Sequence, residues 1–193
     1  RTIRPTRTVI VFDGKGGSNR RRKIFPEYKM GRKMSVRLNR TTGVSLTRED
    51  EHKMMIAQLN RVIEYLECLP LTIITQDNIE ADDVISYVCS LDFFSGWQKI
   101  IVSNDKDFMQ ICDDETVLWR PVKDEVLNTK RIVEQTGVHP TNMALARAII
   151  GDSSDNLPGV KGAGFKTVGK RLGFLSESKT YTIDDVVEHC DEK

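Results

Sequence analysis

The sequence is poor in cysteine, and its four cysteines are too far apart to suggest a zinc knuckle or a disulfide framework (Cys68, Cys89, Cys112 and Cys190). Each lies in an apolar or helical context, which favours a reducing cytoplasm. Long apolar runs are also missing: the longest have about five residues, against the roughly 20 that a membrane span requires. The amino terminus has no apolar stretch of the kind found in a secretory signal. The sequence therefore predicts a cytoplasmic protein with no membrane association.

An excess of charge of one sign is absent too. The 29 Lys and Arg residues nearly cancel the 28 Asp and Glu residues, so the formal net charge is +1, although charged residues make up 30% of the chain. Hydrophobic residues make up 39%, and there are 13 glycines, a composition typical of a globular domain with a buried core. The length of 193 residues suits one domain, or one domain with a small appendage.

The charges are segregated into three blocks along the chain. Residues 15–40 carry ten basic residues and one acid, residues 76–155 carry fifteen acids and seven bases, and residues 156–173 carry four bases and no acid. Two cationic segments around an anionic one are expected where phosphates are gripped while metal ions bridge a carboxylate cluster to them. The alternative is solvated charge on unrelated faces, and it stays open for the first block because such runs are often disordered tails.

Short runs rich in β-branched residues alternate with segments of helical periodicity, which predicts an α/β fold. Strands are expected at residues 8–12, 71–75, 99–103 and 116–119. The first three are apolar enough for a parallel sheet that is covered on both faces. Helices are expected from Thr47 to about Leu66, with Asp50 as the capping-box partner, and at residues 81–91, 129–136, 141–150, 165–172 and 183–190. After Trp119 the pattern indicates helices only.

Acidic residues follow each of the first three predicted strands. They are Asp13 after the first strand, Glu80, Asp82 and Asp83 after the second, and Asp105 and Asp107 after the third. Because the carboxyl ends of parallel strands meet at one edge of a sheet, these side chains should converge there, and Asp152 and Asp155 could join them from the helical part. Singly, a strand-end turn or a helix dipole would explain Asp13, Asp82 or Asp83. Jointly, neither explains acids at three strand ends.

A cluster of these acids requires cations. Two like charges about 4 Å apart repel by roughly 4 kcal/mol at an effective dielectric constant near 20. Ligands that are all oxygen favour Mg²⁺ or Mn²⁺ over Zn²⁺. Two such ions can lower the pKa of a water and stabilise the attacking and leaving oxygens of a phosphodiester. The acids therefore indicate metal-assisted phosphodiester hydrolysis.

Six motifs occur in a fixed order. They are Phe12-Asp-Gly, Tyr28-Lys-Met-Gly-Arg32, Ile79-Glu-Ala-Asp-Asp83, Ser103-Asn-Asp-Lys-Asp-Phe108, Gly151-Asp-Ser-Ser-Asp-Asn156 and Gly159-Val-Lys-Gly-Ala-Gly-Phe-Lys-Thr167. Together they resemble the motifs of the flap endonuclease or 5′-nuclease family, closest to its bacteriophage and bacterial polymerase-associated 5′–3′ exonucleases. The resemblance extends from Thr8 to about Gly173.

The resemblance implies a PIN-like, Rossmann-like α/β fold with a mostly parallel sheet flanked by helices. Residues 1–125 would form the nuclease core, with a basic arch segment at about 15–47. Residues 126–193 would form a helical DNA-binding part, with a helix-three-turn-helix hairpin at about 151–173. The implied activity is cleavage near 5′ ends of DNA with a flap, fork or nick, or of an RNA–DNA hybrid, in replication, primer removal or repair. The implied setting is the cytoplasm of a bacterium or a phage-infected cell.

The resemblance also implies roles for the acids and for the basic arch. Asp13, Glu80, Asp82 and Asp83 look like ligands or outer-shell acids of a first Mg²⁺, and Asp105, Asp107, Asp152 and Asp155 like those of a second, with Mn²⁺ as a substitute for Mg²⁺. Lys29 matches a cation that faces the scissile phosphate, and Arg32 is its motif neighbour. A second such cation matches Arg20, Arg21 or Arg22, and Arg21 is favoured. Tyr28 is either a base-stacking platform, worth about 1–3 kcal/mol, or a buried aromatic.

The last motif resembles the hairpin that grips duplex backbone, often with a K⁺ ion. Its implied DNA contacts are Gly159, Lys161, Gly162, Gly164, Lys166 and Thr167. Glycines allow backbone amides to approach a phosphate, and this contact would recognise shape and not sequence. The alternative is a glycine-rich loop between packed helices.

The implied protein is a monomer that works with replication proteins such as a polymerase or a single-strand binder. The family has a further Asp at the end of a strand that precedes the region seen here, so the sequence is expected to begin inside a longer gene product. Two other functions stay open. One is a non-catalytic module that binds branched DNA and lacks one metal ligand, and the other is an acid-rich phosphatase on a Rossmann-like sheet.

Overall fold

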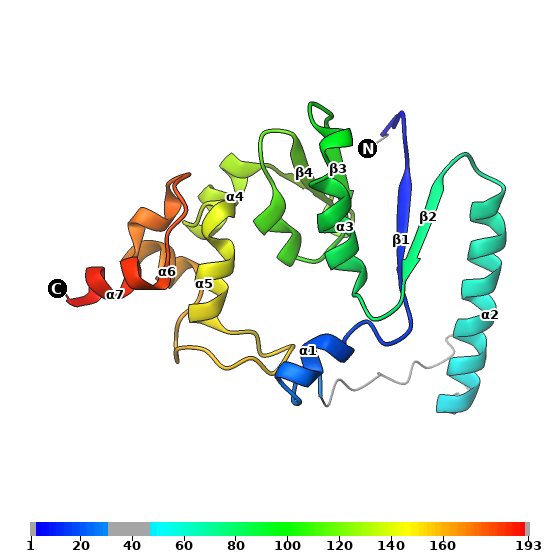
Figure 1. Ribbon diagram of the computed structural model, residues 1–193, viewed down its shortest axis with the longest axis horizontal. Helices are drawn as coiled ribbons and strands as arrows, with labels where there is room; N and C mark the ends of the chain where they lie inside the picture. The colour runs from blue at the N-terminus through cyan, green and yellow to red at the C-terminus, as the bar shows by residue number, and fades with distance from the viewer. Residues whose placement is uncertain (1–2, 31–46, 192–193) are drawn as a thin grey trace.

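The computed structural model describes residues 3–30 and 47–191, and Figure 1 shows their arrangement. The strands are β1 (Val9–Asp13), β2 (Thr72–Gln76), β3 (Lys99–Val102), β4 (Thr116–Arg120) and β5 (Glu125–Leu127). The α-helices are α1 (Asn19–Ile24), α2 (Arg48–Glu67), α3 (Ala81–Cys89), α4 (Thr129–Thr136), α5 (Met143–Ile150), α6 (Phe165–Arg171) and α7 (Ile183–Asp191). The 3₁₀ helices are η1 (Asp92–Phe94), η2 (Asp107–Ile111), η3 (Pro140–Asn142) and η4 (Gly173–Ser176). The order is that of the predicted α/β fold.

The strands form two sheets. β1 pairs in parallel with β2, with Val9 opposite Thr72 and Asp13 opposite Gln76. β3 pairs in parallel with β4, and β4 pairs antiparallel with β5. Within the described residues the two sheets are separate, so the expectation of one sheet is wrong although its parallel pairings are correct. β5 also corrects the expectation that no strand follows Trp119: it returns beside β4 through a short turn.

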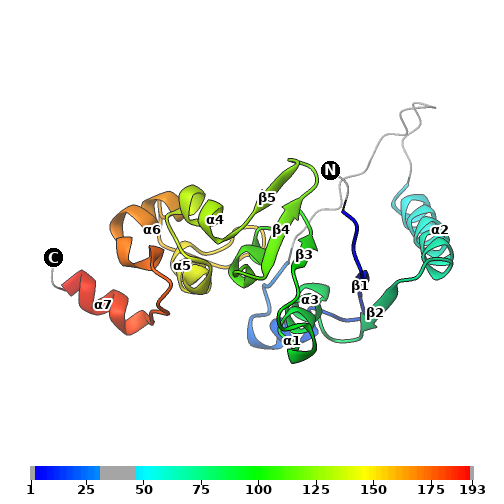
Figure 2. The same cartoon turned by 90° about the horizontal axis from the view of Figure 1, so that it is seen from above.

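An apolar groove separates the two sheets. β1 and β3 lie side by side and run in the same direction without pairing (Figures 1 and 2). The groove has a volume of about 1060 Å³ and is lined by both strands and by Ile85 and Val88 of α3. Ile100 and Val102 of β3 line it and are 41% and 55% exposed. The prediction that β3 is covered on both faces is therefore wrong, because the side chains of Ile100 and Val102 border the groove, while Ile101 on the other face is buried.

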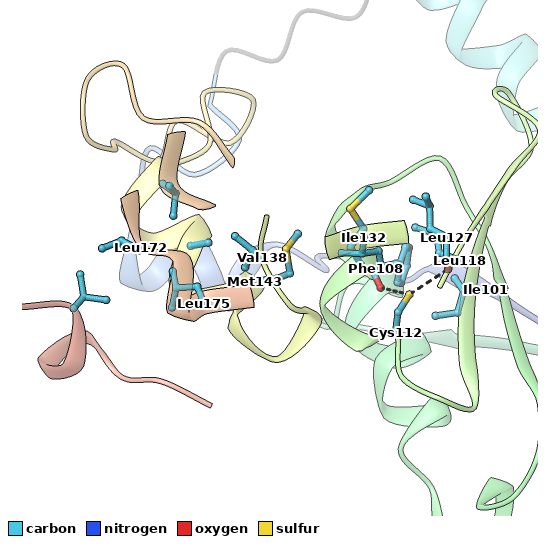
Figure 3. Packing of buried hydrophobic residues seen from close by; sticks show 14 residues of the cluster. Ile101, Phe108, Cys112, Leu118, Leu127, Ile132, Val138, Met143, Leu172 and Leu175 are labelled. Carbon is cyan, nitrogen blue, oxygen red and sulfur yellow. Dashed lines mark hydrogen bonds between the residues drawn. The ribbon is translucent and has the colours of Figure 1, made fainter. Parts of the chain in front are cut away.

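The hydrophobic core lies in the second sheet and the helices that follow it. Leu118 and Leu127 from β4 and β5 are fully buried, as are Ile132 of α4 and Leu175 of η4. Figure 3 shows these side chains in one cluster, which also holds Cys112. All four cysteines are free thiols. The core thus fixes η2, α5 and α6 relative to β3.

α2 begins as predicted but packs less than its pattern suggests. Thr47 and Asp50 form the expected capping box. The apolar residues at helical spacing, however, remain exposed to solvent: Met55 is 47%, Leu59 42% and Val62 45% exposed. Figure 1 shows α2 at the edge of the molecule beside β2. Nowhere in residues 3–30 and 47–191 is a helix both long and apolar enough to cross a bilayer.

Candidate active site

A cleft of about 820 Å³ lies where α1, the start of α3, the segment after β3 and the loop after α5 meet. Six of the eight predicted acidic ligands line it: Asp82, Asp83, Asp105, Asp107, Asp152 and Asp155. Arg21, Tyr28 and Lys29 line it from the segment around α1. Residues separated by more than a hundred positions are therefore brought to one cavity, which holds six of the acids that were expected to converge.

Asp13 and Glu80 are the two predicted ligands that do not line the cleft. Asp13 ends β1, and its Oδ1 accepts a hydrogen bond of 2.8 Å from the amide of Ala81, the first residue of α3. Glu80 precedes this helix and is buried, with 6% of its surface exposed. The prediction that all eight acids face one another is therefore wrong, because Asp13 turns to the start of α3 and Glu80 lies beneath the cleft.

Glu80 is surrounded by three donors. Tyr28 donates its hydroxyl at 3.1 Å, Lys29 donates through Nζ at 2.7 Å, and Arg21 donates through Nη1. Arg21 also donates through Nη2 to Asp83 at 2.7 Å. A buried carboxylate is strongly destabilised unless it is paired, and here two cations and a phenol pair it. Of the three arginines weighed for this position, Arg21 is the one that contacts these acids, while Arg20 and Arg22 are exposed.

Burial and neighbouring charges set the protonation of this group. Burial raises the pKa of Tyr28 to about 12, with Lys29 opposing the change and Glu80 adding to it, so the phenol stays neutral. Burial alone would lower the pKa of Lys29, but the hydrogen bonds with Glu80 and Tyr28 outweigh it and raise that pKa, so the amine stays charged. Tyr28 is 6% exposed, which favours the buried-aromatic alternative over a base-stacking platform.

The acids at the start of α3 differ in their surroundings. Asp83 is exposed and bonded to Arg21. The pKa of Asp82 is raised, first by burial and then by the charge of Glu80. A carboxylate with a raised pKa in a cleft is a common mark of a functional site, although an ion-pair network produces the same shift.

A second group of acids is joined by Arg147 of α5. Its Nη2 donates to Asp107 and, at 2.7 Å, to Asp152. Burial opposes the charge on Asp152, but the hydroxyl and amide of Ser154 and the charge of Arg147 outweigh this, so the pKa of Asp152 is lowered. The sequence reasoning missed Arg147. The available signal was a lone basic residue one turn before Gly151, in a block dominated by acids.

Lys29 connects Glu80 of the first group with the loop that carries Asp152 of the second. Its backbone amide donates to the carbonyl of Asp155 at 3.2 Å, while its side chain reaches Glu80. Its φ of 55° lies in the left-handed region, which is uncommon for a residue other than glycine. Such strain persists where the surrounding structure holds the residue, and it is found often at functional sites. Arg32, the other predicted cation of this motif, lies outside the described residues.

The hairpin predicted to bind duplex DNA joins α5 to α6. Lys161, Lys166 and Thr167 are exposed. Gly162 has a φ of 78°, and Gly164 precedes α6, each with open space where a Cβ would lie. Gly159 differs, because a Cβ there would lie 2.0 Å from the carbonyl oxygen of Ile150. Packing against the end of α5 therefore requires Gly159, whatever its contact with DNA.

The cleft offers only oxygen ligands, which suit Mg²⁺ or Mn²⁺. Among the residues that the structure describes, no three His, Cys, Asp or Glu side chains are close enough together to hold a metal ion as they stand. Instead, Arg21 and Lys29 neutralise the first acid group and Arg147 the second. The chemistry of the donors fits a divalent cation, and the side chains would have to draw together around it.

Comparison with known proteins places this architecture in a family. Residues 1–137 match the family described as "5'-3' exonuclease, N-terminal resolvase-like domain". The chain belongs to this family. A 5'-3' exonuclease of Aquifex aeolicus is 31% identical over 164 residues, which cover 85% of this chain and 51% of the relative. The thermostable DNA polymerase I of Thermus thermophilus is 31% identical over 163 residues, which cover 84% of this chain and 17% of the relative.

The exonuclease-family chain thus spans about half the length of its Aquifex relative. Its fold is that of a solved flap endonuclease from bacteriophage T5, crystallised with DNA and metal ions. The two agree with a TM-score of 0.71 at 21% sequence identity, over 90% of this chain and 61% of that chain. The expected PIN-like fold, with helices after the sheets, is therefore confirmed.

Proposed function

We propose that the protein is a structure-specific 5′ nuclease that hydrolyses phosphodiester bonds near 5′ ends of branched DNA or RNA–DNA duplexes. One observation carries the proposal: six carboxylates and the cations Arg21, Lys29 and Arg147 line a single cleft. Acids that hold metal ions beside cations that face a phosphate are what this hydrolysis requires. The family of the chain supports the same activity. A phosphatase would use the acids but would leave the hairpin lysines without a role.

The proposed metal ligands follow the two acid groups. Asp82 and Asp83, which line the cleft, would serve one Mg²⁺ or Mn²⁺, with the buried Glu80 and Asp13 in the outer shell. Asp105, Asp107, Asp152 and Asp155 would serve the other. When bound, the ions would activate a water and stabilise the leaving oxygen. The T5 flap endonuclease structures that were solved with metal ions support a divalent-metal requirement.

The chain's own cations would act on the phosphate. Lys29 and Arg21 line the cleft and bind Glu80 and Asp83, whereas Arg147 lines it and binds Asp152. Charges held in place before the reaction stabilise the charge that develops on phosphate oxygens, which is usually the largest single contribution to catalysis. The neutral phenol of Tyr28 would keep Glu80 in place beneath them. Arg32 remains a candidate for the same role from the sequence alone.

In this proposal, residues 1–125 form the nuclease core, and the helical part at residues 126–193 binds duplex DNA. Lys161 and Lys166 are exposed on the hairpin and would contact duplex phosphates, with Gly159, Gly162, Gly164 and Thr167 shaping the backbone around them and a K⁺ ion as a further expectation. Such contacts position a duplex without reading its sequence. A DNA polymerase as partner is supported by the polymerase I relatives, and a cytoplasmic setting by the four free thiols.

The direct test uses a DNA duplex with a labelled 5′ flap. Purified protein with Mg²⁺ is expected to release short 5′ products, and EDTA should abolish them. Asp107→Asn should reduce cleavage strongly while the complex with the flap remains detectable by gel shift. Salt-sensitive binding without cleavage, unchanged by Asp107→Asn, would instead establish a non-catalytic module that binds branched DNA.

A further inference from the structure

Asn156 ties together two segments that lie far apart in the sequence. Its side-chain Nδ2 donates to the carbonyl of Met30 at 2.6 Å and to that of Glu27 at 2.8 Å, residues 126 and 129 positions earlier in the chain. One amide group has two N–H donors, and here both are used on a single turn. Figure 1 shows the loop after α5 reaching the segment around α1.

The turn that Asn156 holds is the one that carries Lys29. Met30 donates its backbone amide to Glu27 at 2.9 Å, which closes the turn, and the amide of Lys29 donates to Asp155 at 3.2 Å. With the two bonds from Asn156, three hydrogen bonds connect the turn to the loop after α5. Because Lys29 has a left-handed φ of 55°, these bonds hold a backbone conformation that it would not favour alone.

The sequence of the loop suits this role. Asn156 has a φ of 61°, a left-handed conformation that asparagine tolerates better than other residues with a Cβ. The loop is closed beneath it, because the amides of Asp152 and Leu157 each donate to the other residue's carbonyl, at 2.9 and 2.8 Å. The loop therefore presents Asp152, Asp155 and the Asn156 amide as one unit. An Asn156→Asp side chain could not donate these hydrogen bonds, and its negative charge would repel the two carbonyl oxygens.

We propose that Asn156 is a positioning residue of the cleft, one that fixes Lys29 relative to both acid groups. Through the turn at residues 27–30 it sets where the Lys29 amine lies beside Glu80, and through its own loop it sets the distance to Asp152 and Asp155. The catalytic consequence rests on the proposed nuclease function. The three hydrogen bonds between the turn and the loop after α5, which we call the clip, can by contrast be tested without any activity.

Hydrogen exchange tests the clip directly. In Asn156→Asp, the amides of Lys29 and Met30 should exchange about tenfold faster or more, because the bonds that hold their turn are lost. Core amides such as those of Ile101 and Leu118 should be unchanged. Asn128→Asp is the matched control: it adds the same charge, but Asn128 caps α4 by accepting from Arg131, a role that aspartate fills. Unchanged exchange at Lys29 and Met30 would overturn the clip.

Kinetics on the 5′-flap duplex tests the positioning. Asn156→Asp should lower kcat about tenfold to a hundredfold while the dissociation constant for DNA changes by less than about threefold, because a small misplacement of a catalytic group slows chemistry more than binding. Asn156→Gly, which keeps the left-handed backbone and removes only the side chain, should show the same pattern. Unchanged kcat in both variants would overturn the positioning role even if exchange increases.

A double variant separates this effect from general damage. If Asn156 acts through Lys29, then Lys29→Ala combined with Asn156→Asp should be no slower than Lys29→Ala alone. Additive losses would overturn the proposal. If the wild-type protein fails to cleave the flap, the proposed function fails, and the exchange measurement still decides whether the clip exists.

Discussion

Arg147 donates to Asp152 at 2.7 Å across the first turn of the loop after α5, and the same nitrogen reaches Asp107. The guanidinium therefore stands between two carboxylates that belong to different elements. It lowers the repulsion that would otherwise oppose their approach.

Replacement of Arg147 should destabilise the fold of the metal-free protein. Without metal, in EDTA, Arg147→Ala is expected to lower the free energy of unfolding by about 1–2 kcal/mol, because a partly buried hydrogen bond to a charged group contributes more than an exposed pair. Urea denaturation measures this. Arg61→Ala is the control: Arg61 pairs with Glu64 on the exposed face of α2, and its loss should cost less than about 0.5 kcal/mol. Equal losses in the two variants would contradict the bridging role.

Replacement of Asp82 should stabilise the protein at neutral pH. Its folded pKa lies above the ordinary value of 3.8, because of burial and then the charge of Glu80, so the folded state prefers the protonated form. The contribution of Asp82 to stability therefore falls as pH rises through that folded pKa. Asp82→Asn removes the charge, and its Tm should exceed that of the wild type at pH 7. The difference should shrink in acid near pH 3, where the wild-type carboxyl is protonated. A lower Tm at pH 7 would show that the charge is compensated.

Lys29→Ala should affect cleavage much more than binding. Removal of a preorganised cation at the reacting phosphate typically costs about 10²–10³ in kcat. The dissociation constant for the flap duplex should change only a few-fold, which single-turnover kinetics and gel shift can separate. A parallel loss of affinity and rate would assign Lys29 to substrate binding alone.

Lys166→Ala should have the opposite profile. Lys166 is exposed on the hairpin, so its loss should weaken duplex binding and reduce the slope of log affinity against log salt by about one. Lys123→Ala, in the turn between β4 and β5 and outside the cleft, should leave that slope unchanged. If the two variants behave alike, the hairpin has no special part in DNA binding.

Gly159→Ala should destabilise the fold. A Cβ at this position would lie 2.0 Å from a backbone oxygen of Ile150, which cannot move without a shift of α5, and such overpacking costs about 1–3 kcal/mol. Gly164→Ala is the matched control, because nothing lies within 4 Å of its Cβ position. It should stay within about 0.5 kcal/mol of the wild type in thermal or urea unfolding. Equal stability of the two variants would mean that the loop adjusts freely.

The sequence predicted the features that depend on local chemistry. β-branched runs located four of the strands, Thr47 and Asp50 predicted the start of α2, and acids after strands predicted an acidic cleft. Features that depend on distant partners were missed. Arg147 is an ordinary helical arginine until the fold brings Asp107, 40 residues away, beside it. Asp13 looked like a cleft residue, but its direction is decided by the amide of Ala81, which no local pattern reveals.

The groove between β1 and β3 has a further consequence for how the molecule opens. No ladder of hydrogen bonds crosses it in the part of the chain described by the structure, so the unit of β1, α2 and β2 is joined to the rest through α3 and loops. Regions with few buried apolar contacts separate first under thermal fluctuation, as partial, subglobal unfolding. We expect β1, α2 and β2 to form a cooperative unit of their own, which unfolds before the core around Leu118 does. Limited proteolysis would then cut the chain first within that unit.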